Sequence, residues 1–191
     1  MSLPRKIYVL GIGDDGLDGL TAAAKALVEG AQLLLGPAQV LRGIPPGKGE
    51  RFEVTGDLDA VVKKLEQAGD LQVVFLASGD PLFYGTARFL CEKLGKDRFE
   101  VTPHVSSMQL AFARVKENWD EAYLTNLAAQ SVERVAEKAR TAEKVGIFTT
   151  EQAPPSAVAK ALLDRKIDYF SAYICENLGS PDERVTQADL T

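Results

Sequence analysis

The sequence predicts an α/β fold in two domains, the first of which contains a mostly parallel five-stranded sheet. Two observations lead to this prediction. Short apolar runs alternate with segments of helical periodicity along the whole chain, a pattern typical of parallel strands covered by helices. A polar segment at residues 116–121, which holds the only tryptophan, interrupts the alternation once. We therefore expect domains at 1–116 and 117–191.

The first domain is expected to alternate strands with amphipathic helices. The helical pattern is clearest where Leu58, Val61 and Leu65 recur at three- and four-residue spacing, with Lys63 and Lys64 on the other face. The predicted strands are residues 7–10, 33–35, 51–55, 73–77 and 99–102. The predicted helices are residues 20–31, 58–68, 86–94 and 106–114.

The alternation restarts in the second domain, where the runs predict fewer strands. Strands are expected at residues 122–127, 145–149 and 169–175. Helices are expected at residues 132–141 and 155–165.

Composition restricts the class of protein. Hydrophobic residues make up 46% of the chain and charged residues 26%, with a net charge of −5. An acidic balance without a basic run argues against nucleic acid as the main partner. Cys91 and Cys175 stand far apart in apolar contexts, so we expect buried free thiols in a reducing cytoplasm. No apolar run approaches the length of a membrane span or a secretory signal, so no membrane association is expected.

The first glycine loop follows the first predicted strand and reads Gly11-Ile12-Gly13-Asp14-Asp15-Gly16. This spacing matches the dinucleotide-binding fingerprint and keeps an NAD-dependent oxidoreductase as an alternative function. However, Asp14 and Asp15 would repel a pyrophosphate. The second apolar run ends in Gly36-Pro37, without an acidic residue for a ribose hydroxyl.

A second glycine loop follows the most apolar predicted strand. Gly79 permits close approach of the backbone, Pro81 stiffens the turn, and Asp80 supplies a carboxylate. Ligands of parallel sheets collect at the carboxyl ends of strands, so this loop is a candidate binding site. The alternative is a plain tight turn in which Asp80 caps the next helix.

The third candidate segment contains Pro103, His104, Ser106 and Ser107. Either serine is suited to cap the following helix or to bind a polar ligand there. His104 is the only histidine, and no cluster of ligand residues accompanies it, so no metal site is expected. A histidine-based triad is also disfavoured, because no Gly-x-Ser-x-Gly elbow is present.

The fourth segment follows the last predicted strand. Glu176 and Asn177 stand directly at the strand end and are candidate site residues. Asp182, Glu183 and Arg184 are expected to form a solvated turn with local ion pairs of little energy.

Together these segments resemble the tetrapyrrole methylase family, the class III S-adenosylmethionine-dependent methyltransferases. The resemblance extends through nearly the whole chain, and the ordered set of motifs is more specific than any one of them. Within the family it is closer to the enzymes of cobalamin biosynthesis that methylate a precorrin or cobalt-precorrin at ring carbon C5. The motifs are Gly11-Ile12-Gly13 through Leu20-Thr21, Ser78-Gly79-Asp80-Pro81, Pro103-His104-Val105-Ser106-Ser107 and Glu176 through Arg184.

The resemblance implies a homodimer, a mixed sheet in the second domain, a cleft between the domains, and S-adenosylmethionine as methyl donor. It also implies a small-molecule tetrapyrrole as substrate. The resemblance implies a substrate cleft lined by Gly11, Gly13, Asp14 and His104. The donor contacts that it implies are Gly79, Asp80, Pro81, Tyr84, Ser106, Ser107, Thr149 and Leu178.

The sequence departs from the family pattern in two places. His104 stands where relatives carry glycine, so its side chain is expected to crowd the donor or to contact substrate. Relatives continue beyond Thr191, so the chain is expected to be truncated or part of a fusion with a decarboxylating methyltransferase domain or partner.

Methyl transfer from a sulfonium to a ring carbon needs orientation and desolvation but no protein nucleophile. Asp14, Asp15 and Asp80 are candidate bases for a later proton loss, and Arg88 and Arg114 are candidates for a basic patch that binds substrate carboxylates.

A non-catalytic tetrapyrrole-binding subunit is a further alternative. So is a methylase of ribosomal RNA or diphthamide within the same superfamily, although the acidic charge disfavours the RNA version.

Overall fold

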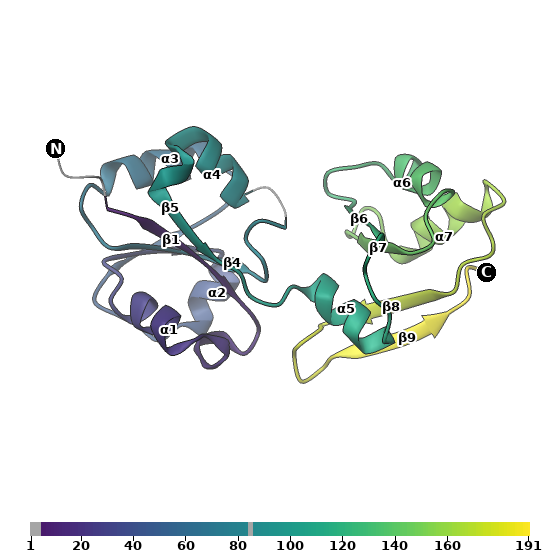
Figure 1. Ribbon diagram of the computed structural model, residues 1–191, viewed down its shortest axis with the longest axis horizontal. Helices are drawn as coiled ribbons and strands as arrows, with labels where there is room; N and C mark the ends of the chain where they lie inside the picture. The colour runs from purple at the N-terminus through teal and green to yellow at the C-terminus, as the bar shows by residue number, and fades with distance from the viewer. Residues whose placement is uncertain (1–4, 84–85) are drawn as a thin grey trace. The chain divides into compact units, whose positions relative to one another are not determined.

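A computed structural model describes residues 5–83 and 86–191. The chain forms two compact units, Met1–Ser106 and Ser107–Thr191 (Figure 1). The polar segment at residues 116–121 follows helix α5 (Ser107–Val115), which belongs to the second unit. Nothing among the described helices is long and apolar enough to cross a membrane.

The first unit contains the predicted five-stranded parallel sheet, in the order β3-β2-β4-β1-β5. Every pair of neighbours is parallel. This confirms the predicted class of fold. The strands are β1 (Ile7–Ile12), β2 (Leu33–Gly36), β3 (Glu50–Glu53), β4 (Val73–Ser78) and β5 (Phe99–Thr102).

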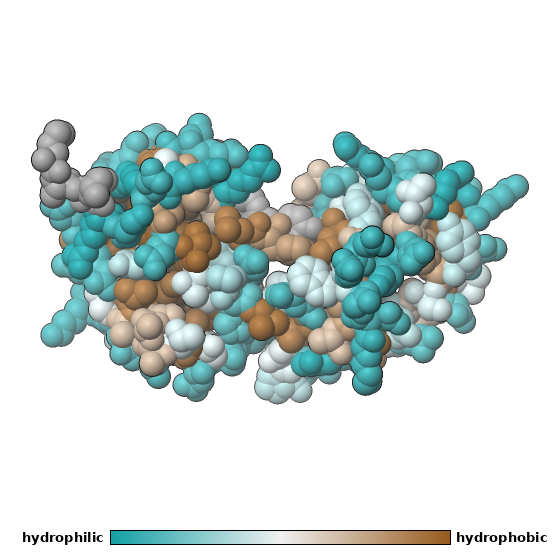
Figure 2. All heavy atoms as spheres, in the orientation of Figure 1, coloured by the Kyte–Doolittle hydropathy of each residue, from teal (hydrophilic) through white to brown (hydrophobic). Residues whose placement is uncertain are grey.

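Helices cover both faces of this sheet (Figure 1). Residues of α3 (Leu58–Gln67) and α4 (Thr86–Leu94) pack with Val9, Leu35 and Phe75 on one face. Residues of α1 (Ala22–Glu29) and α2 (Ala38–Gly43) pack with Leu34 and Leu76 on the other. Successive side chains of a strand point to opposite faces, so the nearly continuous apolar runs supply both cores. The space-filling view shows mainly hydrophilic side chains over the outer surfaces of α3 and α4 (Figure 2).

Side-chain caps place the starts of several helices. Thr21 Oγ1 accepts a hydrogen bond from the Ala24 N–H at 3.2 Å, so α1 begins at Ala22 rather than at residue 20. Asp57 caps α3 in the same way. Such caps satisfy N–H groups that have no partner inside the helix.

The second unit contains two separate two-stranded sheets. Strands β6 (Tyr123–Asn126) and β7 (Val145–Phe148) are parallel, whereas β8 (Ala172–Glu176) and β9 (Arg184–Ala188) are antiparallel. Helices α6 (Val132–Ala139) and α7 (Pro155–Leu163) share a core with Leu127 and Ile167. Both pairing directions of the expected mixed sheet are therefore present, but in two sheets.

The sequence prediction omitted several elements. Helix α2 was missed because Gly36-Pro37 marked the end of the preceding strand. Strand β9 was missed because four of its five residues are exposed, which leaves no apolar alternation to detect. Two short 3-10 helices, η1 (Gly16–Gly19) and η2 (Lys96–Arg98), were also not predicted.

Candidate functional site

Three loops of the first unit meet at the carboxyl edge of its sheet. Strand β1 lies between β4 and β5, with Ile12 opposite Ser78 and Leu10 opposite Thr102. The Gly79 N–H donates a hydrogen bond to the Ile12 carbonyl oxygen at 2.9 Å. The His104 N–H donates to the Gly79 carbonyl oxygen at 3.3 Å. The structure thus brings together the first three candidate segments.

Glycine is required where these loops touch. A Cβ on Gly11 would lie 2.0 Å from the Gly79 carbonyl oxygen and 2.4 Å from the His104 nitrogen. Gly79 has a φ of +64°, and a Cβ there would lie 3.0 Å from the Ser106 Cα. Only a residue without a side chain fits such close approaches of backbone to backbone.

The second loop forms a defined turn. Asp80 Oδ1 accepts a hydrogen bond from the Leu82 N–H at 2.9 Å. The alternative that Asp80 caps the next helix is wrong, because α4 begins only at Thr86. Pro81 is buried and Asp80 is half-buried, whereas Tyr84 lies outside the described residues.

His104 lies in the third loop beside the first glycine loop. Its Nε2 is 3.9 Å from Asp15 Oδ1, and 19% of its side chain is exposed. Asp14 is exposed in the same first loop. A Cβ on Gly13 would lie 2.8 Å from Asp15 Oδ1 and 2.9 Å from His104 Cε1, so the absent side chain at Gly13 leaves room for this pair.

The two candidate serines differ in burial. Ser106 immediately precedes α5 and is 6% exposed. Ser107 is the first residue of that helix and is exposed. The polar groups at the start of this helix therefore lie at the end of the third loop.

The remaining predicted donor contacts belong to the second unit. Thr149 directly follows β7 and is exposed, and Leu178 lies in the turn between β8 and β9, where it is half-buried. Their contact with a methyl donor stays a prediction.

The turn that carries Leu178 is more ordered than the sequence suggested. Arg114 Nη2 donates to Glu183 Oε2 at 3.0 Å, and Arg114 Nε also donates to this carboxylate. The Gly179 N–H donates to Glu183 Oε2 at 2.8 Å. The hydrogen bond from Arg114, followed by that from Gly179, lowers the pKa of Glu183 below its ordinary value.

The expected solvated turn at residues 182–184 is therefore wrong in two respects. Glu183 ties the turn to α5 through Arg114. Arg184 begins strand β9, and its Nε donates to Glu176 Oε2 at 2.8 Å. Asn177 follows the end of β8 with a φ of +51°, as a turn residue.

Both arginines expected in a basic patch have acidic partners. Arg88 Nε lies 2.8 Å from Glu92 Oε1 on the same helix, and Arg114 is bonded to Glu183. Each arginine is thus locally neutralised. Residues 5–83 and 86–191 contain no group of three or more His, Cys, Asp and Glu side chains arranged to hold a metal ion.

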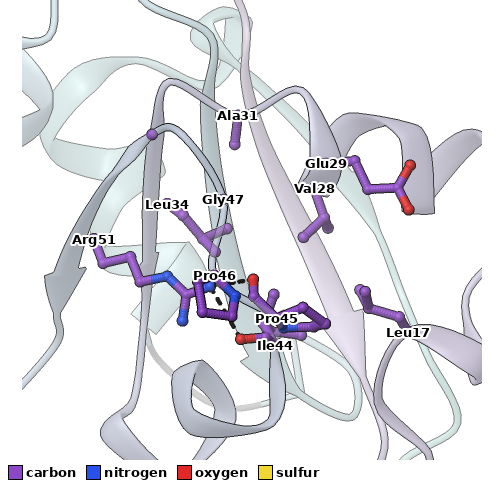
Figure 3. Close-up of a pocket in the computed structure, with 11 residues that line it drawn as sticks. Leu17, Val28, Glu29, Ala31, Leu34, Ile44, Pro45, Pro46, Gly47 and Arg51 are labelled. Carbon is purple, nitrogen blue, oxygen red and sulfur yellow. Dashed lines mark hydrogen bonds between the residues drawn. The ribbon is translucent and has the colours of Figure 1, made fainter.

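The first unit also has a hollow of about 200 Å³ between α1, β2 and the segment that follows α2. At one side of this hollow, the Arg51 guanidinium binds carbonyl groups at the C-terminal end of α2. It donates to the Leu41 carbonyl oxygen at 2.9 Å and to the Ile44 carbonyl oxygen at 3.0 Å. Figure 3 shows the Arg51 guanidinium beside Ile44 and Pro45. The residues that line this hollow do not include any predicted site residue.

The family model described as Tetrapyrrole (Corrin/Porphyrin) Methylases matches residues 6–191. The cobalt-precorrin-7 C(5)-methyltransferase of Salmonella typhimurium is 30% identical over 94% of this chain and 88% of its own. The decarboxylating precorrin-6Y C(5,15)-methyltransferase of Mycobacterium tuberculosis is 32% identical over 93% of this chain and 45% of its own. The chain therefore spans about half the length of the latter relative.

Solved structures share the fold. The precorrin-6Y methylase of Archaeoglobus fulgidus superposes with a TM-score of 0.70 at 20% identity, over 97% of this chain and 90% of its own. The uroporphyrin-III C-methyl transferase of Thermus thermophilus, complexed with S-adenosyl homocysteine, gives 0.72 at 21% identity, over 97% and 83%. At these identities the likeness shows the fold.

Proposed function

We propose that this chain, which belongs to the tetrapyrrole (corrin/porphyrin) methylase family, transfers a methyl group from S-adenosylmethionine to carbon 5 of a precorrin or cobalt-precorrin. Its relatives are named precorrin methyltransferases, so the chain is a methyltransferase of cobalamin biosynthesis. The observation that supports this function best is the junction of Gly11, Gly79 and His104 at the carboxyl edge of the sheet. Ligands of parallel α/β sheets bind at that edge.

The junction suits a cationic methyl donor. When bound, S-adenosylmethionine supplies a methyl group on a positively charged sulfur. Asp15 and Asp80 place carboxylates on the first and second loops, and a carboxylate attracts a sulfonium but repels a pyrophosphate. This charge favours the methyl donor over a nicotinamide dinucleotide.

We assign the donor contacts to Gly79, Asp80, Pro81, Ser106 and Ser107, all at or beside the junction in the chain. Gly79 permits close approach of the backbone, and Ser107 presents an exposed hydroxyl. Gly11, Gly13, Asp14 and His104 are assigned to the substrate. Tyr84, Thr149 and Leu178 complete the proposed set.

The residues of the chain position the reactants and exclude water. The ring carbon is the nucleophile, so no activated side chain is required for the displacement itself. Precorrins carry carboxylates, and Arg88 and Arg114 would have to exchange their acidic partners for substrate in order to bind them. The proposal further includes a homodimer. Light scattering of the protein as it leaves a size-exclusion column tests this by measuring its molar mass.

The direct test is single-turnover methyl transfer with two candidate substrates, precorrin-6Y and cobalt-precorrin-7. The chain is incubated with donor carrying a carbon-13 methyl group, and the product is examined by NMR. We expect the labelled methyl at carbon 5 of one of them. Donor binding without transfer to either substrate would contradict the assigned substrate, and absence of donor binding would contradict methyltransferase activity in this chain.

A further inference from the structure

His104 is the one titratable side chain of the third loop, at residues 103–106. Its imidazole lies against the first loop, with Nε2 3.9 Å from Asp15 Oδ1. In the tautomer that carries hydrogen on Nδ1, this nitrogen donates toward the Val105 carbonyl oxygen at 3.4 Å. Nε2 then keeps a lone pair that can accept a proton, and the Asp15 carboxylate lies where it can pair with the protonated ring.

The surroundings hold this pair in place. Asp15 is seated against the 3-10 helix η1, because a Cβ on Gly19 would lie 2.2 Å from Asp15 Oδ2. A small cavity of about 50 Å³ is lined by His104 and by uncharged residues. Its other side chains are Leu10, Leu20, Thr21, Ala24, Thr102 and Pro103. Asp15 is thus the charged group that faces His104 across this part of the first unit.

The proposed reaction needs a proton acceptor. The ring carbon gives an electron pair to the methyl carbon, and the bond from sulfur to methyl breaks with its electron pair left on sulfur. The ring has then gained one positive charge. Loss of a proton from the methylated carbon returns the C–H electron pair to the ring and restores its charge.

The carboxylates of the two glycine loops are less suited than the His104 imidazole to accept this proton. Asp80 already accepts the hydrogen bond of Leu82, and Asp14 and Asp15 are both exposed. An imidazole is a far better proton acceptor near neutral pH than an ionised carboxylate. When it gains the proton, its new charge lies beside the Asp15 carboxylate.

We propose that His104 Nε2 removes the proton from the methylated carbon, with the Val105 carbonyl oxygen accepting from Nδ1–H and Asp15 stabilising the protonated imidazole. The inference rests on the proposed methyl transfer to a tetrapyrrole carbon. It gives His104 a catalytic role, and Asp15 acts through His104 by stabilising the protonated imidazole.

The test compares His104→Gln and Asp15→Asn with Asp18→Asn as matched control. Asp18 belongs to η1, has a 94% exposed side chain and lies 4.0 Å from Lys25, so its carboxylate is away from His104. Donor affinity is measured by calorimetry for each protein. The single-turnover rate is then measured against pH, with substrate carrying hydrogen or deuterium on the reacting carbon.

We expect unchanged donor affinity in His104→Gln and Asp18→Asn and weaker donor binding in Asp15→Asn, whose lost carboxylate attracts the sulfonium, so rates are compared at saturating donor. The rate should be reduced about 10²- to 10⁴-fold in His104→Gln, the usual contribution of a positioned proton acceptor. The wild-type rate should fall at acid pH as the imidazole gains a proton, and His104→Gln should lose this fall. Asp15→Asn should be about tenfold slower, with the fall displaced to lower pH because the protonated form loses its partner. The deuterium effect should be larger in His104→Gln, where proton removal limits the rate.

A His104→Gln rate within threefold of wild type, with the same acid fall, would overturn the assignment while leaving the methyl transfer intact. If His104→Gln does not fold, the Asp15→Asn variant decides instead. A dependence of its single-turnover rate on pH that coincides with that of Asp18→Asn would also overturn the assignment. A wild-type protein that binds donor but transfers nothing would instead reject the proposed function on which the assignment rests.

Discussion

Gly11 lies so close to Gly79 that a Cβ on Gly11 would come 2.0 Å from the Gly79 carbonyl oxygen. The end of β1 and the second glycine loop therefore meet through backbone atoms, and this contact requires glycine at position 11. We expect Gly11→Ala to lower the free energy of unfolding by about 3 kcal/mol, at the upper end of the usual cost of overpacking. Urea denaturation followed by circular dichroism measures the effect.

Gly43→Ala is the matched control for that substitution, because a Cβ on Gly43 meets nothing within 4 Å. Gly43 is the last residue of α2, where alanine is at least as favourable as glycine. Its stability should stay within about 1 kcal/mol of wild type. Equal stabilities of the two variants would show that the close contact at Gly11 is absent in solution.

Gly79→Ala tests the second loop. The φ of +64° at Gly79 costs alanine about 1–2 kcal/mol, and the new Cβ would also crowd Ser106. Gly69→Ala provides the same strain at a φ of +54° in open space. Calorimetry should show donor affinity reduced at least about tenfold in Gly79→Ala, equivalent to 1.4 kcal/mol. A similar loss in Gly69→Ala would trace the effect to general destabilisation.

The Arg114–Glu183 pair predicts a pH-dependent contribution to stability. Because the hydrogen bond from Arg114 lowers the pKa of folded Glu183, the carboxylate stabilises the fold above the ordinary glutamate value of about 4.3. This contribution is lost as the pH falls through the lower value of the folded state. Glu183→Gln should therefore be less stable than wild type at pH 7, and the difference should shrink toward pH 3.

Asp164→Asn is the control for this experiment. It removes an exposed helical pair with Lys160, which typically contributes less than about 0.5 kcal/mol. Denaturation curves recorded at several pH values measure both variants. A Glu183→Gln difference that is constant with pH would contradict the assigned ion pair.

The two cysteines are free and half-buried rather than fully buried as expected. Burial raises the pKa of both thiols, and the nearby Glu183 raises that of Cys175 further. A raised pKa lowers the thiolate fraction, so iodoacetamide should react more slowly with the folded than with the unfolded protein at pH 7. Glu183→Gln should accelerate labelling of Cys175 alone, with Cys91 as internal control in the same mass spectrum. Equal acceleration of both would indicate loosening of the fold instead.

Much of the first unit could be predicted from sequence because its strands are nearly continuous apolar runs. Val73 to Leu76 are buried on both faces of the sheet, and a short continuous apolar run is typical of such a strand. The helix at residues 86–94 was predicted with the bounds that the structure gives. Strand β9 could not be predicted, because only its antiparallel partner β8 orders its exposed residues.

The contacts of the site were less predictable than its loops. The sequence placed Gly11, Gly79 and His104 after three strands, but strand order alone decides that these loops are neighbours. The pairing of His104 with Asp15 depends on the path of η1, which no sequence pattern indicated. Glu183 lies in a charged segment that is typical of a solvated turn. Its partner Arg114 could not be identified from the sequence, because it stands 69 residues earlier in the chain.

The central claim is that this junction of loops binds a methyl donor rather than a dinucleotide. Calorimetric titration of the folded chain with S-adenosylmethionine, in parallel with a titration against NADH, tests it most directly. We predict binding of the methyl donor with a dissociation constant between about 1 μM and 1 mM, the ordinary range for enzyme substrates, and no heat with NADH. Binding of NADH, or no binding of the methyl donor by protein that unfolds cooperatively, would contradict the account.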